Sequence, residues 1–230
     1  MKQLFNLLAI VLLIACGQEE PQHDFTLKGH VKGLKKGTVY LQRQQDTMMV
    51  TLDSLEIQGE PNFELHYDLE EPEVLFLRLD KNDNDEGTVA VFANTGVTEV
   101  NTTLKNFNYD AVVKGSKQQE VLEEYLVMMS KFNDRNLEII QESLEASKAN
   151  DTTVSFEENY NKLLRRKYLY TINFAVNNKD SEVAPYLAIS EIPDTSVKFL
   201  EEIYDALTDD IKNSKYGVQL KDLIALRKEN

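Results

Sequence analysis

The chain has 230 residues, of which 42% are hydrophobic and 28% charged, and its formal net charge is −14. This length allows one large domain or two small ones, and the balance of residue types argues against long disorder and against a polytopic membrane protein. The excess of acids repels phosphate backbones and anionic lipid headgroups, so we expect no nucleic-acid partner.

The N-terminus has the pattern of a signal peptide. Lys2 supplies a positive charge, and residues 4–15 form an apolar run interrupted only by Asn6. The run is shorter than the roughly 20 residues that span a membrane, and its length is typical of a signal-peptide core. It ends in Leu13-Ile14-Ala15-Cys16, which resembles the lipobox of bacterial lipoproteins. We therefore predict a signal peptide over residues 1–15 and attachment of lipid to the Cys16 thiol.

Cys16 is the only cysteine of the chain. Exported proteins normally use cysteines in disulfide pairs, and lipidation explains a single one. We predict a polar tether over residues 16–24 and membrane attachment through the acyl chains, since two or more chains hold a protein stably. The predicted location is the envelope of a Gram-negative bacterium, as an outer-membrane lipoprotein that faces the periplasm or is exposed at the surface.

Residues 25–115 predict an antiparallel β-sandwich-like domain. Apolar and polar residues alternate in short runs that are separated by Gly and Asn-Asp turns, which is typical of antiparallel sheets with one buried face. The expected strands lie near residues 25–29, 38–41, 63–69, 75–79, 88–93 and 98–104.

Residues 116–230 predict an α-helical region, which makes the fold class α+β. Ser116 with Gln119 has the spacing of a capping box, and Ser155 with Glu158 offers a second helix start. Apolar positions at helical spacing continue from the first start to Leu144, and a polar break follows at residues 148–154. Shorter helices are expected at Ser181–Ile192, Asp194–Leu207 and Lys215–Arg227. The two halves are either two domains or one unit.

The sequence offers no clear metal site. His23, His30 and His66 are scattered along the chain, whereas imidazole and thiolate sites need clustered ligands. A site formed in space by two of the histidines is the alternative. Residues 80–87 have the alternate oxygen side chains of a calcium loop, but Asp85 replaces the required glycine and Val91 the bidentate acid. We predict a hairpin turn there, with a weak calcium site as the alternative.

No catalytic motif is present. The chain lacks the Gly-x-Ser-x-Gly, His-Glu-x-x-His and phosphate-binding glycine-loop patterns. Pairs of carboxylates are expected by chance among 39 acids. We predict no catalytic residue, no cofactor and no enzymatic activity.

Several short motifs resemble the N-terminal region of bacterial lipoprotein thiol:disulfide oxidoreductases of the AhpC/TSA and thioredoxin-like family. The matching stretches are Phe25–Leu34, Thr38–Leu41, Leu52–Ser54 before Phe63, Val113–Ser116 and Ser214–Gly217. In that family an uncharacterised β domain and a helical segment precede a thioredoxin-like domain with a Cys-Pro-x-Cys pair. Because this chain has no Cys-x-x-Cys pair and stops at Asn230, we expect that domain to be missing, and no catalytic residue carries over.

These observations favour a non-enzymatic binding or interaction module at the membrane, with a protein or small molecule as its unidentified partner. One alternative is an accessory anchor for a separate thioredoxin-like oxidoreductase. Another is an envelope hydrolase, which requires a cleft with converging carboxylates and at least one raised pKa.

Overall fold

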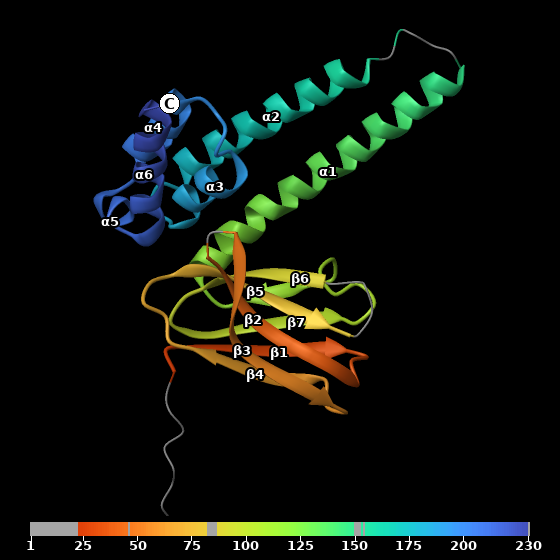
Figure 1. The fold of residues 1–230 in the computed structure, drawn as a ribbon, viewed down its shortest axis with the longest axis vertical. Coiled ribbons are helices and arrows are strands. Elements are labelled where there is room, and N and C mark those ends of the chain that lie inside the picture. Colours follow the sequence, from red (N-terminus) through yellow and green to blue (C-terminus); the bar gives the residue numbers. More distant parts are fainter. Residues whose placement is uncertain (1–22, 46, 82–86, 150–152, 154, 230) are drawn as a thin grey trace, which may run out of the picture.

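The computed structural model describes residues 23–45, 47–81, 87–149, 153 and 155–229. Cys16, the predicted signal peptide, most of the tether and residues 82–86 of the predicted hairpin turn lie outside the described residues. Two sheets in the N-terminal half are followed by helices, which confirms the predicted α+β class (Figure 1). None of the described helices has the length and apolar character needed to cross a membrane.

The N-terminal half is a sandwich of two four-stranded sheets. The first sheet has the order β4-β1-β7-β8 and the second β3-β2-β5-β6. The described strands are β1 (Phe25–Lys32), β2 (Lys36–Gln45), β3 (Met48–Gln58), β4 (Asn62–Tyr67), β5 (Glu73–Asp80), β6 (Gly87–Ala93), β7 (Gly96–Thr103) and β8 (Val112–Lys114).

The expectation of a purely antiparallel sandwich was wrong for one pair, because β1 and β7 run parallel. Parallel neighbours need a long crossover, and here the whole run from β2 to β6 provides it. The alternation of apolar and polar residues shows which face of a strand is buried, but it does not show whether the strand runs parallel or antiparallel to its neighbour. It also missed β3, which is exposed along most of its length and buries only Ile57 among its eleven residues.

The alternating apolar side chains of both sheets meet in one core, with Phe25, Leu27, Leu41, Leu75 and Leu77 at its centre. Gly29 lies opposite Phe63 on β4, and the phenyl ring occupies the place of the missing side chain. A Cβ atom on Gly29 would lie 1.9 Å from Phe63 Cζ. This close approach explains a glycine in the middle of a strand.

The C-terminal half is built on a long antiparallel hairpin of two helices. The helices are α1 (Lys117–Ala149), α2 (Phe156–Asn177), α3 (Val183–Glu191), α4 (Val197–Ala206), α5 (Asp209–Lys212) and α6 (Lys215–Glu229). Both predicted serine caps are confirmed: the backbone N–H of Gln119 donates to Ser116 Oγ at 3.1 Å, and that of Glu158 to Ser155 Oγ at 3.3 Å. The helix expected at 194–207 is shorter, and α5 was not predicted.

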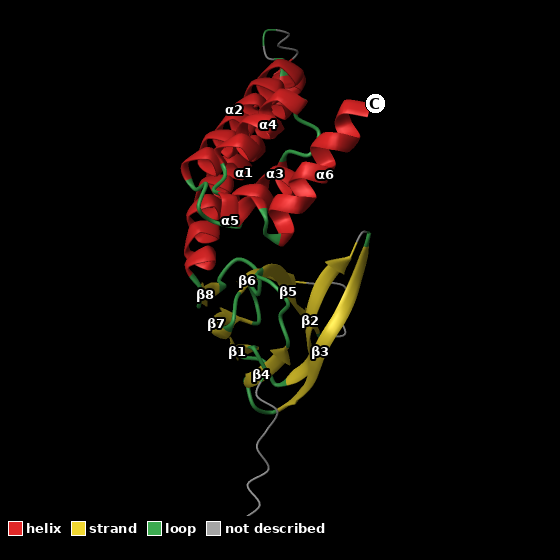
Figure 2. Ribbon diagram, turned by 90° about the vertical axis from the view of Figure 1, so that its left-hand side faces the viewer, coloured by secondary structure: helices red, strands yellow, loops and turns green. Residues whose placement is uncertain are grey.

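The two halves pack through a shared apolar cluster. The outer face of β5 and β6 contributes Val74 and Phe92, and the helices contribute Leu122, Tyr125, Met129, Phe174, Val183, Leu187 and Tyr216. The helical layer therefore lies against the outer face of the second sheet (Figure 2). Residues 74–77 of β5 are apolar on both faces, because one face meets the sandwich core and the other meets the helices.

Candidate functional site

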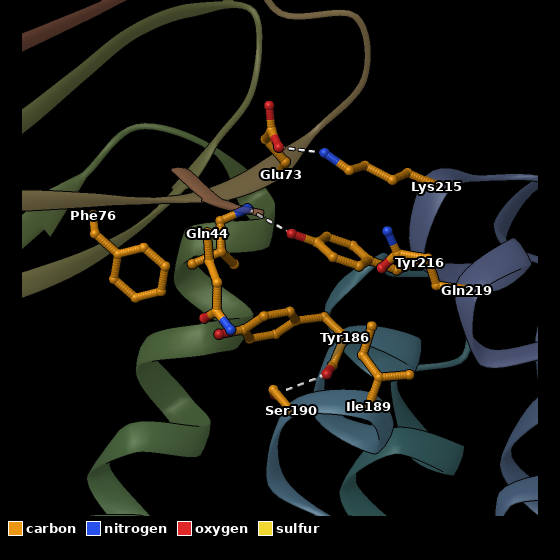
Figure 3. A pocket seen from close by; sticks show the side chains of 10 residues that line it. Gln44, Glu73, Phe76, Tyr186, Ile189, Ser190, Lys215, Tyr216 and Gln219 are labelled. Atoms are coloured by element: carbon orange, nitrogen blue, oxygen red, sulfur yellow. Dashed lines mark hydrogen bonds and ion pairs between the residues drawn. The ribbon is translucent and has the colours of Figure 1, made fainter. Parts of the chain in front are cut away.

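A cavity of about 450 Å³ lies where the second sheet meets α3 and α6 (Figure 3). Strands β2 and β5 form one wall and the two helices form the other. The cavity is lined by Gln44, Glu73, Val74, Phe76, Tyr186, Ile189, Ser190, Lys215, Tyr216 and Gln219.

The cavity exists because β2 separates from β5. The two strands pair from Thr38 opposite Asp80 to Gln42 opposite Phe76 and no further. A register shift between Leu41 and Gln42 occurs at this point, and the rest of β2 pairs with β3 alone. The backbone of β5 before Phe76 therefore loses its strand partner on this side, and buried backbone groups need another one.

Tyr216 of α6 supplies that partner. The backbone N–H of Val74 donates to the Tyr216 hydroxyl at 2.8 Å (Figure 3). The ring lies edge-on to Phe92 at 6.0 Å and beside Tyr186 at 5.2 Å between centroids. Burial raises the pKa of Tyr216 far above its ordinary value, so the phenol stays neutral.

Helix α1 does the same for β6 on the other side of this strand pair. Phe92 lies opposite Val74, and its backbone N–H donates to Gln119 Oε1 at 2.7 Å. Its carbonyl accepts from Ser116 Oγ at 3.0 Å. Gln119 thus bonds the edge of the sheet with its side chain instead of closing the predicted capping box. Side chains of α1 and α6 therefore fix the helical half to the backbone of the sheet.

A buried carboxylate is part of the cavity lining. Glu73 is only 3% exposed, and its carboxylate pairs with the ammonium of Lys215 and lies 3.7 Å from Arg43 Nη1. The backbone N–H of Lys215 donates to Glu71 Oε2 at 2.6 Å, and Arg43 donates to the Tyr67 hydroxyl at 3.0 Å. A buried carboxylate needs such partners, so Glu73 joins β2, β5 and α6.

The remaining lining is aromatic and amide in character. Phe76 and Tyr186 present rings (Figure 3), and Gln44 and Gln219 are exposed residues of the lining. Burial also raises the pKa of Tyr186. Apolar rings with a few hydrogen-bonding groups are typical of small-molecule sites. Among the lining residues the charge of Glu73 is matched by that of Lys215, so the arrangement suits a neutral, polar ligand.

The histidines that the sequence left scattered are partly brought together. His23 and His66 stack with ring centroids 5.4 Å apart. Their Nδ1 atoms lie 2.9 Å from Asp68 Oδ1 and 3.2 Å from Thr26 Oγ1, respectively. His30 lies elsewhere and bonds Asn62 at 2.7 Å. Within the described ranges, no group of three or more His, Cys, Asp or Glu side chains could hold a metal ion.

The cavity residues were not predicted as a site, although one of the resembling motifs contains two of them. In Ser214–Gly217, Lys215 pairs with Glu73 and Tyr216 bonds Val74. A Cβ atom on Gly217 would lie 2.0 Å from the carbonyl oxygen of Ile211, so only glycine fits there. The motif therefore joins the helices to the sheet.

Comparison with known families finds a match for the β half. Residues 25–122 match the family model DUF4369, described as a domain of unknown function. The DUF4369 match covers every described strand and ends within α1, so it includes Ser116 and Gln119, which bond Phe92. No curated protein matches the chain, and no solved structure does.

Proposed function

We propose that the protein is an envelope lipoprotein, held at the membrane by acyl chains on Cys16, whose DUF4369 domain and helices form a non-catalytic binding module. Its ligand site is the cavity between the second sheet and α3 and α6. The observation that carries the proposal is the composition of this cavity, with aromatic rings and amides beside the ion pair of Glu73 and Lys215. This composition favours a small, neutral, hydroxyl-rich ligand, of which a saccharide is the simplest class.

The lining supports binding over hydrolysis. Among the described residues that line the cavity, Glu73 is the only acid, and Lys215 already pairs with it. General acid–base cleavage of glycosides uses two carboxylates on opposite sides of the bond. A single paired carboxylate instead serves to hold the walls in place.

Calorimetric titration of the purified protein with neutral mono- and oligosaccharides tests the site. We expect saturable binding that weakens at least fivefold in Gln44→Ala and Gln219→Ala, because both amides line the cavity and are exposed. Gln141→Ala, an exposed amide on α1, is the matched control and should bind as the unchanged protein does. Absence of binding across the panel, or equal losses in the control, would contradict the site.

Membrane attachment is tested separately through Cys16. The apolar run and the lipobox-like end of the first sixteen residues support lipidation. Cys16→Ser should leave the signal peptide uncleaved and abolish incorporation of labelled palmitate, since the thiol is the acceptor. Unchanged processing and unchanged palmitate incorporation would refute the anchor and leave the cavity proposal standing.

A second candidate role follows from the family resemblance. We infer that the chain is related to the N-terminal region of lipoprotein thiol:disulfide oxidoreductases, supported by the motifs and by the DUF4369 match over residues 25–122. These 230 residues contain no Cys-x-x-Cys pair, so the redox chemistry of this role would come from a partner that carries one. Affinity purification of the tagged protein from the envelope should recover a Cys-x-x-Cys oxidoreductase, and its consistent absence would remove this role.

A further inference from the structure

The α1–α2 hairpin extends well beyond the other helices. Helix α1 has 33 residues, and its distal half projects with α2 away from the rest of the molecule (Figure 1). An isolated helix pair has two long sides, and near the sheet one of them is covered by α3. The distal part has no such cover among the described helices.

Helix α3 shows which kind of helix packs against this side of the hairpin. Val183 and Leu187 pack with Tyr125 of α1 and Phe174 of α2 in one apolar cluster. At the far end of α3, Glu191 pairs with Lys167 of α2 at 2.9 Å. The helix thus lies along the groove between α1 and α2 and ends there.

Apolar side chains continue in the same groove beyond α3. We call this surface the distal groove, and it consists of Leu137, Ile140 and Leu144 on α1 and Phe156 and Tyr160 on α2. On α1 they follow the i, i+3, i+7 spacing that places them along one side of a helix. Phe156 and Tyr160 stack with centroids 5.7 Å apart. Each of the five side chains is 39–64% exposed.

The exposed area has the size of a binding surface. At about 200 Å² for each large side chain, the exposed fractions of the five residues amount to roughly 500 Å² of mostly apolar surface. The largest contiguous apolar patch on a typical monomer measures about 300–600 Å² and is often functional. A standard interface covers about 800 Å² on each partner, a little over half of it apolar.

The opposite side of the distal hairpin is polar. Arg135 pairs with Glu138 at 2.7 Å and with Glu142 at 2.8 Å. On α2, Lys162 pairs with Glu158 at 2.6 Å. At 100° per residue these positions lie on the flank away from the distal groove. The exposed apolar surface is therefore one-sided, which suits a single occupant.

We propose that the distal groove binds an amphipathic α-helix of another envelope protein, in continuation of α3. From Leu137 to Ala149, α1 spans about 19 Å, so the bound helix has about 13 residues with apolar anchors at i, i+3 or i+4, and i+7. The groove is continuous with the one that α3 fills, and α3 shows that an apolar helix fits there.

A second copy of the chain is disfavoured as the occupant of the distal groove if the protein is anchored through Cys16 as proposed. Two grooves can face each other only with the hairpins antiparallel, because α3 occupies the same side nearer the sheet. The start of β1 and the hairpin tip lie at opposite ends of the long axis (Figure 1). An antiparallel pair would therefore direct the two N-termini away from each other, which disfavours a pair that stands upright on one membrane.

Photo-crosslinking in cells of the producing bacterium tests the proposal. Benzoylphenylalanine replaces Leu144 in the full chain, and the control replaces Val127, which is 61% exposed on α1 outside the groove. We expect the Leu144 probe to yield one protein adduct at least fivefold above the Val127 probe. Mass spectrometry of the adduct should place the crosslink in an amphipathic helix. Adding Leu137→Glu should remove the adduct, while Val127→Glu should not.

Other outcomes overturn the proposal. An adduct of two identical chains would identify a second copy as the occupant, and an adduct with lipid would identify a membrane surface. Equal adducts at both probe positions, or none at Leu144, would show that the distal groove is not an interface. Because each substituted side chain is exposed, circular dichroism should show unchanged folding. Membrane fractionation tests the Cys16 anchor independently, so a failure of the proposed anchor can be distinguished from a failure of the distal-groove proposal.

Discussion

The hydrogen bond between Tyr216 and the backbone of β5 gives a sharp test of how the helices are fixed to the sheet. Tyr216→Phe keeps the ring against Phe92 and Tyr186 and removes only the hydroxyl. The Val74 N–H, which donates to that hydroxyl at 2.8 Å, is then left buried without its acceptor. The substitution therefore isolates one hydrogen bond from the packing around it.

The expected cost follows from that unsatisfied group. A buried donor that loses its acceptor costs about 1–3 kcal/mol. With a urea m-value of about 2 kcal/mol/M, a loss of about 2 kcal/mol lowers the unfolding midpoint by about 1 M. The ring contacts are unchanged, so little of this loss comes from apolar burial.

Urea unfolding monitored by circular dichroism measures the midpoint, and hydrogen exchange measures the Val74 amide directly. Tyr109→Phe is the control, because that side chain is 87% exposed and should leave the midpoint within a few tenths of a molar. In Tyr216→Phe the Val74 amide should exchange faster than in the unchanged protein. An unchanged midpoint together with unchanged protection of Val74 would show that this bond does not hold the helices to the sheet.

Three further predictions concern the same framework. Gln119→Ala should destabilise the fold by about 1–3 kcal/mol, because the buried Phe92 N–H loses its acceptor; denaturation should show no comparable loss for the exposed Gln141→Ala. Gly29→Ala should destabilise the sandwich, since the new Cβ would lie 1.9 Å from Phe63 Cζ. Adding Phe63→Leu to that variant should recover part of the lost melting temperature. If the changes in melting temperature of the two single variants simply add in the double variant, the clash is not the cause. Burial raises the pKa of both Tyr125 and Tyr216. Their contribution to the free energy of unfolding is therefore complete below about pH 10, the ordinary tyrosine pKa. It is lost as the pH rises above that value, because these tyrosines ionise first in the unfolded chain. Tyr125→Phe should therefore flatten the fall in unfolding free energy between pH 10 and 12, and an unchanged slope would contradict the burial effect.

Local patterns determined most elements of this protein, although β3 and α5 were missed. Alternation placed β1, β5 and β7 near their observed positions, and Ser116 and Ser155 marked the starts of α1 and α2. These features depend on neighbours a few residues apart, because strand burial repeats every second residue and a cap bonds within one helical turn. The lipobox-like end at Cys16 is likewise a local pattern, and lipidation there stays a prediction.

Tertiary structure alone decided how the elements meet. The parallel pairing of β1 with β7, the stacking of His23 on His66 and the bond from Val74 to Tyr216 join residues far apart in sequence, 142 positions in the last case. No periodicity records such partners, because each depends on the summed geometry of everything between them. The cavity follows from this as well, since the separation of β2 from β5 leaves a space that only α3 and α6 complete.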